Sequence, residues 1–294
     1  MSRLTLDLDA LRSFVTGVDL QGYAKAADLL GRSTSAVSAH LKKLEEQTGA
    51  PLFRKSGRQL ALTESGQTLL GYARRLLDLN DEAFAAVRAP QLEGRVRFGL
   101  QEDFGESLLP HVLGQFSRVH RKVLIEARIA RNAELLERVR SSRLDLALVW
   151  GDTEGASIVE RVGELQTCWI GNDDMADYLK NRPDEPLPLV LFDDPCPFQS
   201  MAVAALQRAG IEWRISYTSP SLAGLWAGTQ AGLGFTVRTR VGLPSGLRIL
   251  EGDAHGLPPL PRLSLSLHRG DANSEPVHAL AETVLASVRR AIVQ

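Results

Sequence analysis

The chain has 294 residues, of which 44% are hydrophobic and 23% charged, and its formal net charge is −1 at pH 7. This composition excludes a disordered or fibrous chain, and the near-zero net charge by itself indicates no class of partner. Because the length exceeds the ~100–200 residues of a typical single domain, we expect a small and a larger domain, or two lobes.

The N-terminal stretch, MSRLTLDLDA, carries acidic residues where a secretory signal peptide needs an apolar run. No later stretch has the roughly eighteen uninterrupted apolar residues of a membrane-spanning helix. Cys168 and Cys196 lie far apart and form no C-x-x-C pair, so we interpret them as reduced, buried thiols. These features predict a cytoplasmic protein.

The first part of the chain predicts two helices. Apolar residues recur at helical spacing over Asp7–Asp19, which indicates an amphipathic helix that ends before Gly22. Tyr23–Leu30 is alanine-rich, and its small side chains permit a neighbouring helix to approach closely.

A third helix is expected after Ser33, a suitable N-cap whose side-chain oxygen can accept a backbone N–H of the first turn. Val37, Leu41 and Leu44 recur at i, i+4 and i+7 and therefore face the core. Gly49 is expected to end the helix in the left-handed conformation.

The second and third helices are joined by a tight turn, and the third exposes short hydroxyl side chains at its N-terminus. This pattern is typical of a helix-turn-helix, in which the later helix lies in the major groove of DNA. Hydroxyls and helix-terminal N–H groups suit phosphates and base edges, and lysines suit phosphates farther along. The candidate DNA contacts on this helix are Ser33, Thr34, Ser35, Ser38, His40, Lys42 and Lys43. Taken alone, the segment also fits a plain helical hairpin with a capped second helix.

Residues 51–66, PLFRKSGRQLALTESG, predict two short strands around a glycine-containing turn, KSGR. Arg54, Lys55 and Arg58 make this hairpin a basic wing. From Lys25 to Arg75 the chain has nine basic and four acidic residues, which fits either a solvated helical face or a polyanion-binding surface. A winged helix-turn-helix explains the hydroxyls, the hairpin and the charge together, so we interpret residues 1–63 as a DNA-binding domain.

Residues 64–89 predict a long linker helix, capped by Thr63 and ended by Pro90. Its apolar residues step by three and four, and Asn80 at one of these positions is of the kind that fixes the register of a helix pair. The candidate dimerisation residues are Leu69, Ala73, Leu76, Leu77, Asn80, Phe84 and Val87. Packing of this stripe against its own domain remains the alternative.

Residues 90–294 alternate strands and helices and therefore predict an α/β effector-binding domain. We expect lobe one to comprise about 90–163 and 269–294 and lobe two about 164–268. Crossing strands are expected near Glu164–Ile170 and Leu263–His268. Ligands in such folds bind between the lobes, at the carboxyl ends of strands.

No catalytic constellation occurs in this region. G-x-S-x-G, H-E-x-x-H and Walker motifs are absent, and GLGF at 232–235 lacks the third glycine of a dinucleotide fingerprint. The six histidines show no metal-ligand spacing. We therefore expect neither an enzyme nor a bound metal or cofactor.

The stretch AADLLGRSTSAVSAHLKKLEEQTGAPLFRKSGRQLALTESGQTLL resembles the N-terminal signature of the LysR-type transcriptional regulators, and the resemblance extends over essentially the full length. It implies a winged DNA reader, a dimerising linker helix, a C-terminal domain like periplasmic binding proteins, and assembly as a tetramer that is a dimer of dimers. The stretches RVRFGLQEDF, ARNAELLE, PLVLFDDPCPF and GLPPLP are most similar to the LrhA/HexA branch.

Individual positions both match and depart from this family. Ser33, Ser35, Ser38 and Lys42 match its recognition-helix pattern, and Lys55 and Arg58 match its basic wing positions. Thr34, Ala39 and His40 stand where the family often has Gln, Arg and Gln. The resemblance therefore implies phosphate binding, with a sequence preference that differs from the usual one.

The effector site is expected where the first strand of the C-terminal domain ends, at Gln101, Glu102 and Asp103. Two carboxylates there disfavour a small organic anion unless Arg131 or a helix N-terminus compensates. Trp150 and Phe198 either line this pocket or belong to the core, and Ser219 and Ser221 either contact a ligand or only cap a helix. The effector is then cationic, neutral or absent.

These features predict a DNA-binding transcriptional regulator modulated by a small molecule between two lobes. The alternative is a cytoplasmic solute-binding protein whose N-terminal domain only oligomerises.

Overall fold

The computed structural model describes residues 5–56, 59–88, 91–151, 158–175, 185–250, 256–271 and 274–293. The chain divides into two compact units, an N-terminal unit up to Pro90 and a C-terminal unit from Gln91 to Ile292.

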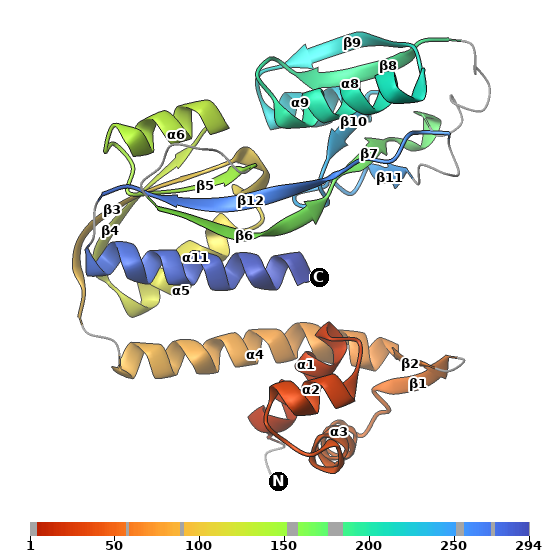
Figure 1. Ribbon diagram of the computed structural model, residues 1–294. Coiled ribbons are helices and arrows are strands. Elements are labelled where there is room, and N and C mark those ends of the chain that lie inside the picture. The colour runs from red at the N-terminus through yellow and green to blue at the C-terminus, as the bar shows by residue number, and fades with distance from the viewer. Residues whose placement is uncertain are drawn as a thin grey trace. The chain divides into compact units, whose positions relative to one another are not determined.

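The N-terminal unit begins with three helices, α1 (Leu8–Asp19), α2 (Tyr23–Leu29) and α3 (Thr34–Thr48) (Figure 1). The ends of α3 match the expected caps, Ser33 and Gly49. Asp7 caps α1 by accepting a hydrogen bond from the Ala10 N–H at 3.0 Å, and Ser33 caps α3. Gly49 ends α3 with φ at 68°, in the left-handed region that favours glycine. The apolar faces of α1 and α3 meet in one core.

The wing consists of β1 (Phe53–Ser56) and β2 (Gln59–Leu62), an antiparallel pair in which Phe53 lies opposite Leu62. It leads directly into α4 (Glu64–Arg88), the predicted linker helix. The Thr63 hydroxyl ties the two together, because it accepts from the Gly66 N–H at 3.0 Å and donates to the Pro51 carbonyl at 2.7 Å. The first turn of α4 is therefore fixed against the segment that enters the wing.

Lobe one of the C-terminal unit is a five-stranded sheet in the order β4-β3-β5-β12-β6. Its strands are β3 (Glu93–Leu100), β4 (Lys122–Ile129), β5 (Leu146–Trp150), β6 (Ile158–Gln166) and β12 (Arg262–Arg269). The first three are parallel, and β12 runs antiparallel between β5 and β6. Figure 1 shows α5 (Leu109–Val119) and α11 (Glu275–Val293) on one face of the sheet and α6 (Asn132–Arg140) on the other. All of β5 is buried, as its continuous apolar run predicts.

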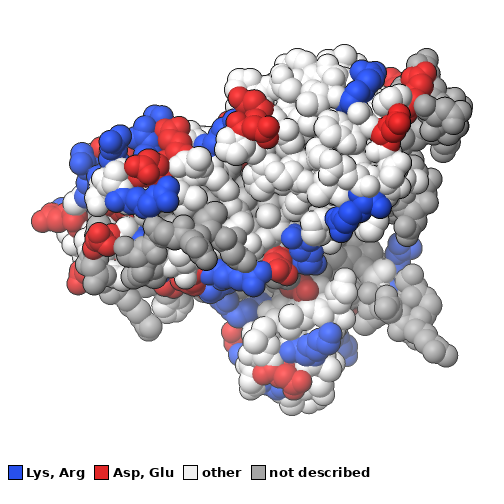
Figure 2. All heavy atoms as spheres, turned by 45° about the horizontal axis from the view of Figure 1, so that its top comes forward, with Lys and Arg blue, Asp and Glu red and all other residues white. Residues whose placement is uncertain are grey.

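Lobe two contains the parallel pair β8 (Leu187–Phe192) and β9 (Trp213–Ser219) and the antiparallel set β10-β7-β11. The latter strands are β10 (Thr236–Arg238), β7 (Cys168–Gly171) and β11 (Arg248–Leu250). A parallel bridge between Leu189 and Phe235 connects the two sets. Lobe two also contains the helices α8 (Pro197–Ala209) and α9 (Leu222–Gln230). Figure 2 shows a largely uncharged surface over α8 and α9, and charges of both signs over α6.

The backbone crosses between the lobes at two adjacent places. β6 passes into β7 at Thr167, and the chain returns into β12 after Pro261. The Thr167 hydroxyl donates to the Pro261 carbonyl at 2.5 Å, and the Gln166 amide donates to the Leu260 carbonyl at 3.0 Å. The two crossings are therefore hydrogen-bonded to each other.

Both cysteines are free thiols, as expected; Cys196 is buried and Cys168 is half-buried. Burial raises the pKa of the Cys168 thiol. Within the described part of the chain, no helix is long and apolar enough to cross a membrane. In the same residues, no group of three or more His, Cys, Asp or Glu side chains is arranged to hold a metal ion.

Candidate functional site

The N-terminus of α3 exposes a row of hydroxyl side chains. The Ser33 oxygen accepts from the Ala36 N–H at 3.2 Å and lies 3.0 Å from the Ser35 hydroxyl. The Ser38 hydroxyl donates to the Thr34 carbonyl at 3.0 Å, so its lone pairs remain as acceptors. All four hydroxyl residues are exposed, and this part of α3 presents short polar groups to solvent.

The two adjacent lysines of α3 differ in their partners. The Lys42 side chain is 79% exposed, and its ammonium lies 3.8 Å from Glu46. The Lys43 ammonium lies 2.5 Å from the carboxylate of Asp7, the N-cap of α1. This hydrogen bond, together with that from the Ala10 N–H, lowers the pKa of Asp7. Lys43 therefore holds α3 against α1, whereas Lys42 extends from the surface.

His40 lies at the contact between α3 and α1. Its Nδ1 is 2.7 Å from the hydroxyl oxygen of the buried Ser13. The same hydroxyl lies 3.0 Å from the Asp9 carbonyl oxygen, so one side of the His40 ring is held against α1.

The wing is described in part. Arg54 is exposed on β1. Only the backbone of Lys55 is described, and Arg58 lies outside the described residues.

The apolar stripe of α4 divides between two environments. Leu69, Ala73 and Leu77, which the sequence assigned to a dimer seam, are buried in the core of their own unit. They pack there because α1 lies against α4. The α4 surface open to a second copy is accordingly narrower than the sequence predicts.

Part of the apolar stripe of α4 is exposed, including three of the residues that the sequence predicts for dimerisation. Leu76 is exposed to 38%, Phe84 to 57% and Val87 to 87%. Tyr72 and Leu79, which the sequence analysis did not select, are exposed to 56% and 58%. The half-exposed amide of Asn80 donates to Asp81 at 3.0 Å. A groove of about 540 Å³ adjoins the first half of this face and is lined by Leu6, Thr48, Ala50, Leu52, Glu64, Ser65, Thr68, Leu69, Tyr72 and Leu76.

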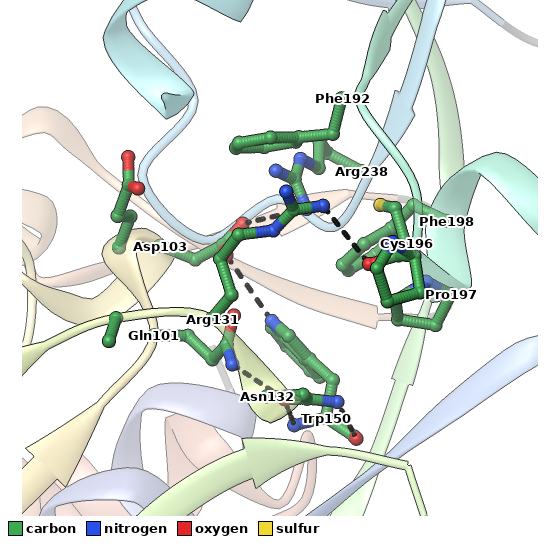
Figure 3. Close-up of a pocket in the computed structure, with 13 residues that line it drawn as sticks. Gln101, Asp103, Arg131, Asn132, Trp150, Phe192, Cys196, Pro197, Phe198 and Arg238 are labelled. Carbon is green, nitrogen blue, oxygen red and sulfur yellow. Dashed lines mark hydrogen bonds and ion pairs between the residues drawn. The ribbon is translucent and has the colours of Figure 1, made fainter. Parts of the chain in front are cut away.

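A second candidate site is the pocket between the lobes of the C-terminal unit (Figure 3). Its volume is about 30 Å³, room for one or two water molecules. Six of the eight predicted effector residues line it. The full lining is Gln101, Glu102, Asp103, Ala130, Arg131, Asn132, Trp150, Phe192, Pro195, Cys196, Pro197, Phe198 and Arg238.

A buried ion pair lies at the centre of the pocket. Asp103 of lobe one and Arg238 of lobe two are 2% and 4% exposed, with Oδ1 and Nη1 3.8 Å apart. Asp103 Oδ2 accepts from the Trp150 indole N–H at 3.2 Å. The Arg238 guanidinium carbon lies 4.3 Å from the ring centre of Phe192 and 4.5 Å from that of Phe198. Each aromatic ring contacts the cation through its face.

Two further contacts join the lobes across the pocket. Figure 3 shows the Arg131 side chain crossing it from lobe one; its guanidinium donates to the Asp193 carboxylate at 2.6 Å, to the Pro195 carbonyl at 3.0 Å and to the Asp193 carbonyl. The Glu102 carboxylate accepts from the backbone N–H of Leu222, in the first turn of α9, at 2.5 Å. These contacts hold the pocket closed.

The lobe-one side of the pocket is fixed by Asn132. Its side-chain oxygen accepts from the Gln101 amide at 2.5 Å and from the Trp150 backbone N–H at 3.1 Å, and its amide donates to the Trp150 carbonyl at 2.6 Å. The ends of β3 and β5 are thereby tied together at the pocket.

Ser219 and Ser221 are not among the lining residues. The Ser221 side chain caps α9 by accepting from the Gly224 N–H at 3.2 Å. The buried Ser219 hydroxyl donates to the Ser221 carbonyl at 3.1 Å. Both hydroxyls thus bond to the turn that opens α9.

Sequence reasoning missed Asn132, Phe192 and Arg238. Asn132 directly follows the predicted residue Arg131, and Phe192 directly precedes Asp193. Both lie at or near the end of a strand, and this position could have indicated them from the sequence. Arg238 ends a strand of lobe two, and no local pattern relates it to Asp103.

Comparisons with known proteins match both units. A model of bacterial regulatory helix-turn-helix proteins of the lysR family matches residues 8–67, and a model of the LysR substrate binding domain matches residues 89–289. The chain is similar to the transcriptional regulator PecT of Dickeya dadantii (strain 3937), with 36% identity over 97% of this chain and 89% of PecT. It is also similar to the transcriptional regulator DgdR of Burkholderia cepacia, with 38% identity over 90% of this chain and 87% of DgdR.

Solved structures share the fold. HinK, a LysR family transcriptional regulator from Pseudomonas aeruginosa, is similar with a TM-score of 0.54 and 19% identity over 98% of this chain and 100% of HinK. ArgP from Mycobacterium tuberculosis is similar with a TM-score of 0.54 and 20% identity over 96% of this chain and 97% of ArgP.

Proposed function

Because the chain belongs to the LysR family of DNA-binding transcriptional regulators, with an N-terminal helix-turn-helix and an effector-binding domain, we propose which of its residues contact DNA and which bind an effector. In this proposal the exposed face of α3 and the basic wing contact DNA, and the interlobe pocket binds an effector. A ligand that prefers one lobe arrangement shifts the positions of the DNA readers, since differential affinity is what couples the two sites.

The observation that supports the DNA contact is the division of polar groups on α3. The hydroxyls of Thr34, Ser35 and Ser38 are exposed, and Lys42 extends beside them. Short hydroxyls at a helix N-terminus fit base edges and phosphates, and an exposed lysine fits a phosphate. We assign sequence preference to Thr34 and His40, and non-specific affinity to Lys42 and the wing.

Lys42→Ala is expected to weaken binding to all duplex sequences and to flatten the plot of log affinity against log salt by about 0.9. The reason is that one phosphate contact, with its released counterion, is lost. A mobility-shift assay over a salt series measures the slope.

Lys43→Ala is the matched control, because the Lys43 ammonium already pairs with Asp7. Its salt slope is expected to stay closer to that of the parent chain. Equal slopes for the parent chain and Lys42→Ala would contradict the assignment. A complete absence of salt-dependent duplex binding would favour the alternative, a solute-binding protein with an oligomerisation domain.

We also propose that α4 forms a homodimer through its exposed apolar residues, with the chain assembling further into a tetramer. Tyr72, Leu76, Leu79, Phe84 and Val87 remain exposed, whereas Leu69, Ala73 and Leu77 of the same helix are buried. An exposed apolar stripe of this kind is suited to another helix. In such a dimer the two half-sites on DNA lie one helical turn, ~34–36 Å, or multiples of it apart.

The double variant Leu79→Ser, Phe84→Ser is expected to shift the chain from dimer or tetramer toward monomer, because it removes two large apolar contacts. Sedimentation velocity at several protein concentrations measures the shift. The control is Leu29→Ser, an apolar residue 70% exposed on α2, which is expected to leave the mass unchanged. An unaltered mass for the α4 double variant would contradict the dimer face.

Membership of the LrhA/HexA branch is the narrower part of the proposal. Its support is the set of C-terminal stretches RVRFGLQEDF, ARNAELLE, PLVLFDDPCPF and GLPPLP. Selection of bound sequences from random duplex DNA tests it, because the operator identifies the regulated promoters.

A further inference from the structure

Two buried charged side chains in the interlobe pocket each keep an unused hydrogen-bonding atom. No described group bonds to Oδ1 of Asp103 or to Nε of Arg238. Their closest charged atoms are 3.8 Å apart, which is too far for a hydrogen bond. Buried polar atoms in native proteins nearly always have a partner, so the pair calls for a third group that both donates and accepts.

We propose that this pocket binds a small zwitterion of the amino-acid class, with its carboxylate on Arg238 and its ammonium on Asp103. The inference deepens the proposed effector function and rests on it.

The surroundings of Arg238 and Asp103 determine which of their atoms can bind a ligand. Phe192 and Phe198 cover the faces of the Arg238 guanidinium, at 4.3 and 4.5 Å, so only its edge can donate to a ligand. A carboxylate matches that edge with two parallel hydrogen bonds. Oδ2 of Asp103 already accepts from Trp150, which leaves Oδ1 for a donor such as an ammonium.

The charge balance of the pocket favours a ligand without net charge. Asp103 and Arg238, the two side chains assigned to the ligand, compensate each other's charge, and Arg131 pairs with Asp193. Glu102 is engaged by the Leu222 N–H. An anion or a cation would add an uncompensated charge in a closed site, which is costly, whereas a zwitterion adds none.

The size of the pocket connects binding to the arrangement of the lobes. A volume of about 30 Å³ holds water but no amino acid, so a side chain must leave. Arg131 is the candidate, because its side chain is 31% exposed and its guanidinium lies over Phe192 at 5.4 Å. A ligand that displaces Arg131 breaks its bonds to Asp193 and Pro195 and so releases one of the contacts that join the lobes.

The test is calorimetric titration of the full chain with L-alanine, L-valine and L-phenylalanine. Each amino acid is compared with two analogues, the carboxylate that lacks the amino group and the amine that lacks the carboxylate. At least one amino acid is expected to bind once per chain, with an affinity at least about tenfold higher than that of either analogue. Arg131→Gln is expected to tighten binding by about tenfold, because the competing contact is gone. Arg238→Gln is expected to abolish binding, and tryptophan fluorescence checks that this variant folds.

Two results would overturn the inference. Equal affinity for an amino acid and its matched carboxylate would mean an anion site. No binding of any of these compounds to the parent chain or to Arg131→Gln would mean that water alone fills the pocket. Salt-dependent DNA binding, measured on the same samples, separates this failure from failure of the proposed function, since the first leaves DNA binding intact.

Discussion

Replacing Asp103 with alanine is expected to lower the free energy of unfolding of the C-terminal unit by about 3–5 kcal/mol. The substitution leaves the Arg238 guanidinium buried without its counter-charge and the Trp150 indole N–H without its acceptor. A buried unpaired charge cannot regain the hydration that it has in water, and this loss dominates the effect.

All four tryptophans of the chain, Trp150, Trp169, Trp213 and Trp226, belong to the C-terminal unit, so denaturant unfolding followed by their fluorescence reports on that unit. The matched control is Asp173→Ala, which removes a 2.6 Å ion pair with Arg248 whose side chains are 67% and 72% exposed. Its cost is expected to stay below about 1 kcal/mol.

The double variant Asp103→Leu, Arg238→Met tests the cause of the destabilisation. Replacing both charges with apolar side chains of similar volume is expected to restore most of the stability, because no charge then remains buried alone. A single variant as stable as the parent chain would contradict the assignment of a buried ion pair.

Gly66→Ala is expected to destabilise the N-terminal unit by about 2–3 kcal/mol and to weaken DNA binding. An added Cβ would lie 2.2 Å from the Leu52 carbonyl oxygen, a backbone atom that cannot rotate away. The first turn of α4 would then have to move from the segment that leads into the wing. Hydrogen exchange of peptides covering residues 50–70 measures the local loss, beside a mobility-shift assay.

Gly71→Ala in the same helix is the control. Its Cβ would meet no atom within 4 Å, so the substitution is expected to stabilise α4 by up to about 1 kcal/mol through its helix propensity. If the Gly66→Ala and Gly71→Ala variants show the same rates of hydrogen exchange, the close contact between α4 and Leu52 is not what fixes the wing.

Local chemistry accounts for the parts of the fold that the sequence predicted well. Ser33 and Gly49 mark the ends of α3 because capping and left-handed backbone depend on single residues. Longer patterned segments were equally accessible: β8 coincides with a continuous apolar run, and α11 with an amphipathic pattern. β11 shows no such pattern, because three residues are too few to show a period.

Long-range packing accounts for what the sequence left open. The periodicity of α4 identified an apolar stripe, but it does not tell which neighbour covers each position, and α1 covers Leu69, Ala73 and Leu77. In the pocket, strand-end residues such as Asp103 and Trp150 were accessible from the sequence. Arg238 was not, because only the folding of lobe two against lobe one brings it to Asp103.

The paired strand crossings restrict how an occupied pocket can be sensed elsewhere in the molecule. Two backbone segments fastened side by side, at Thr167 with Pro261 and at Gln166 with Leu260, resist sliding and separation but still permit torsion. We therefore expect the lobes to move relative to each other mainly by rotation about that double connection. In the proposed function, a bound effector would then be reported to the rest of the molecule as an angle between the lobes.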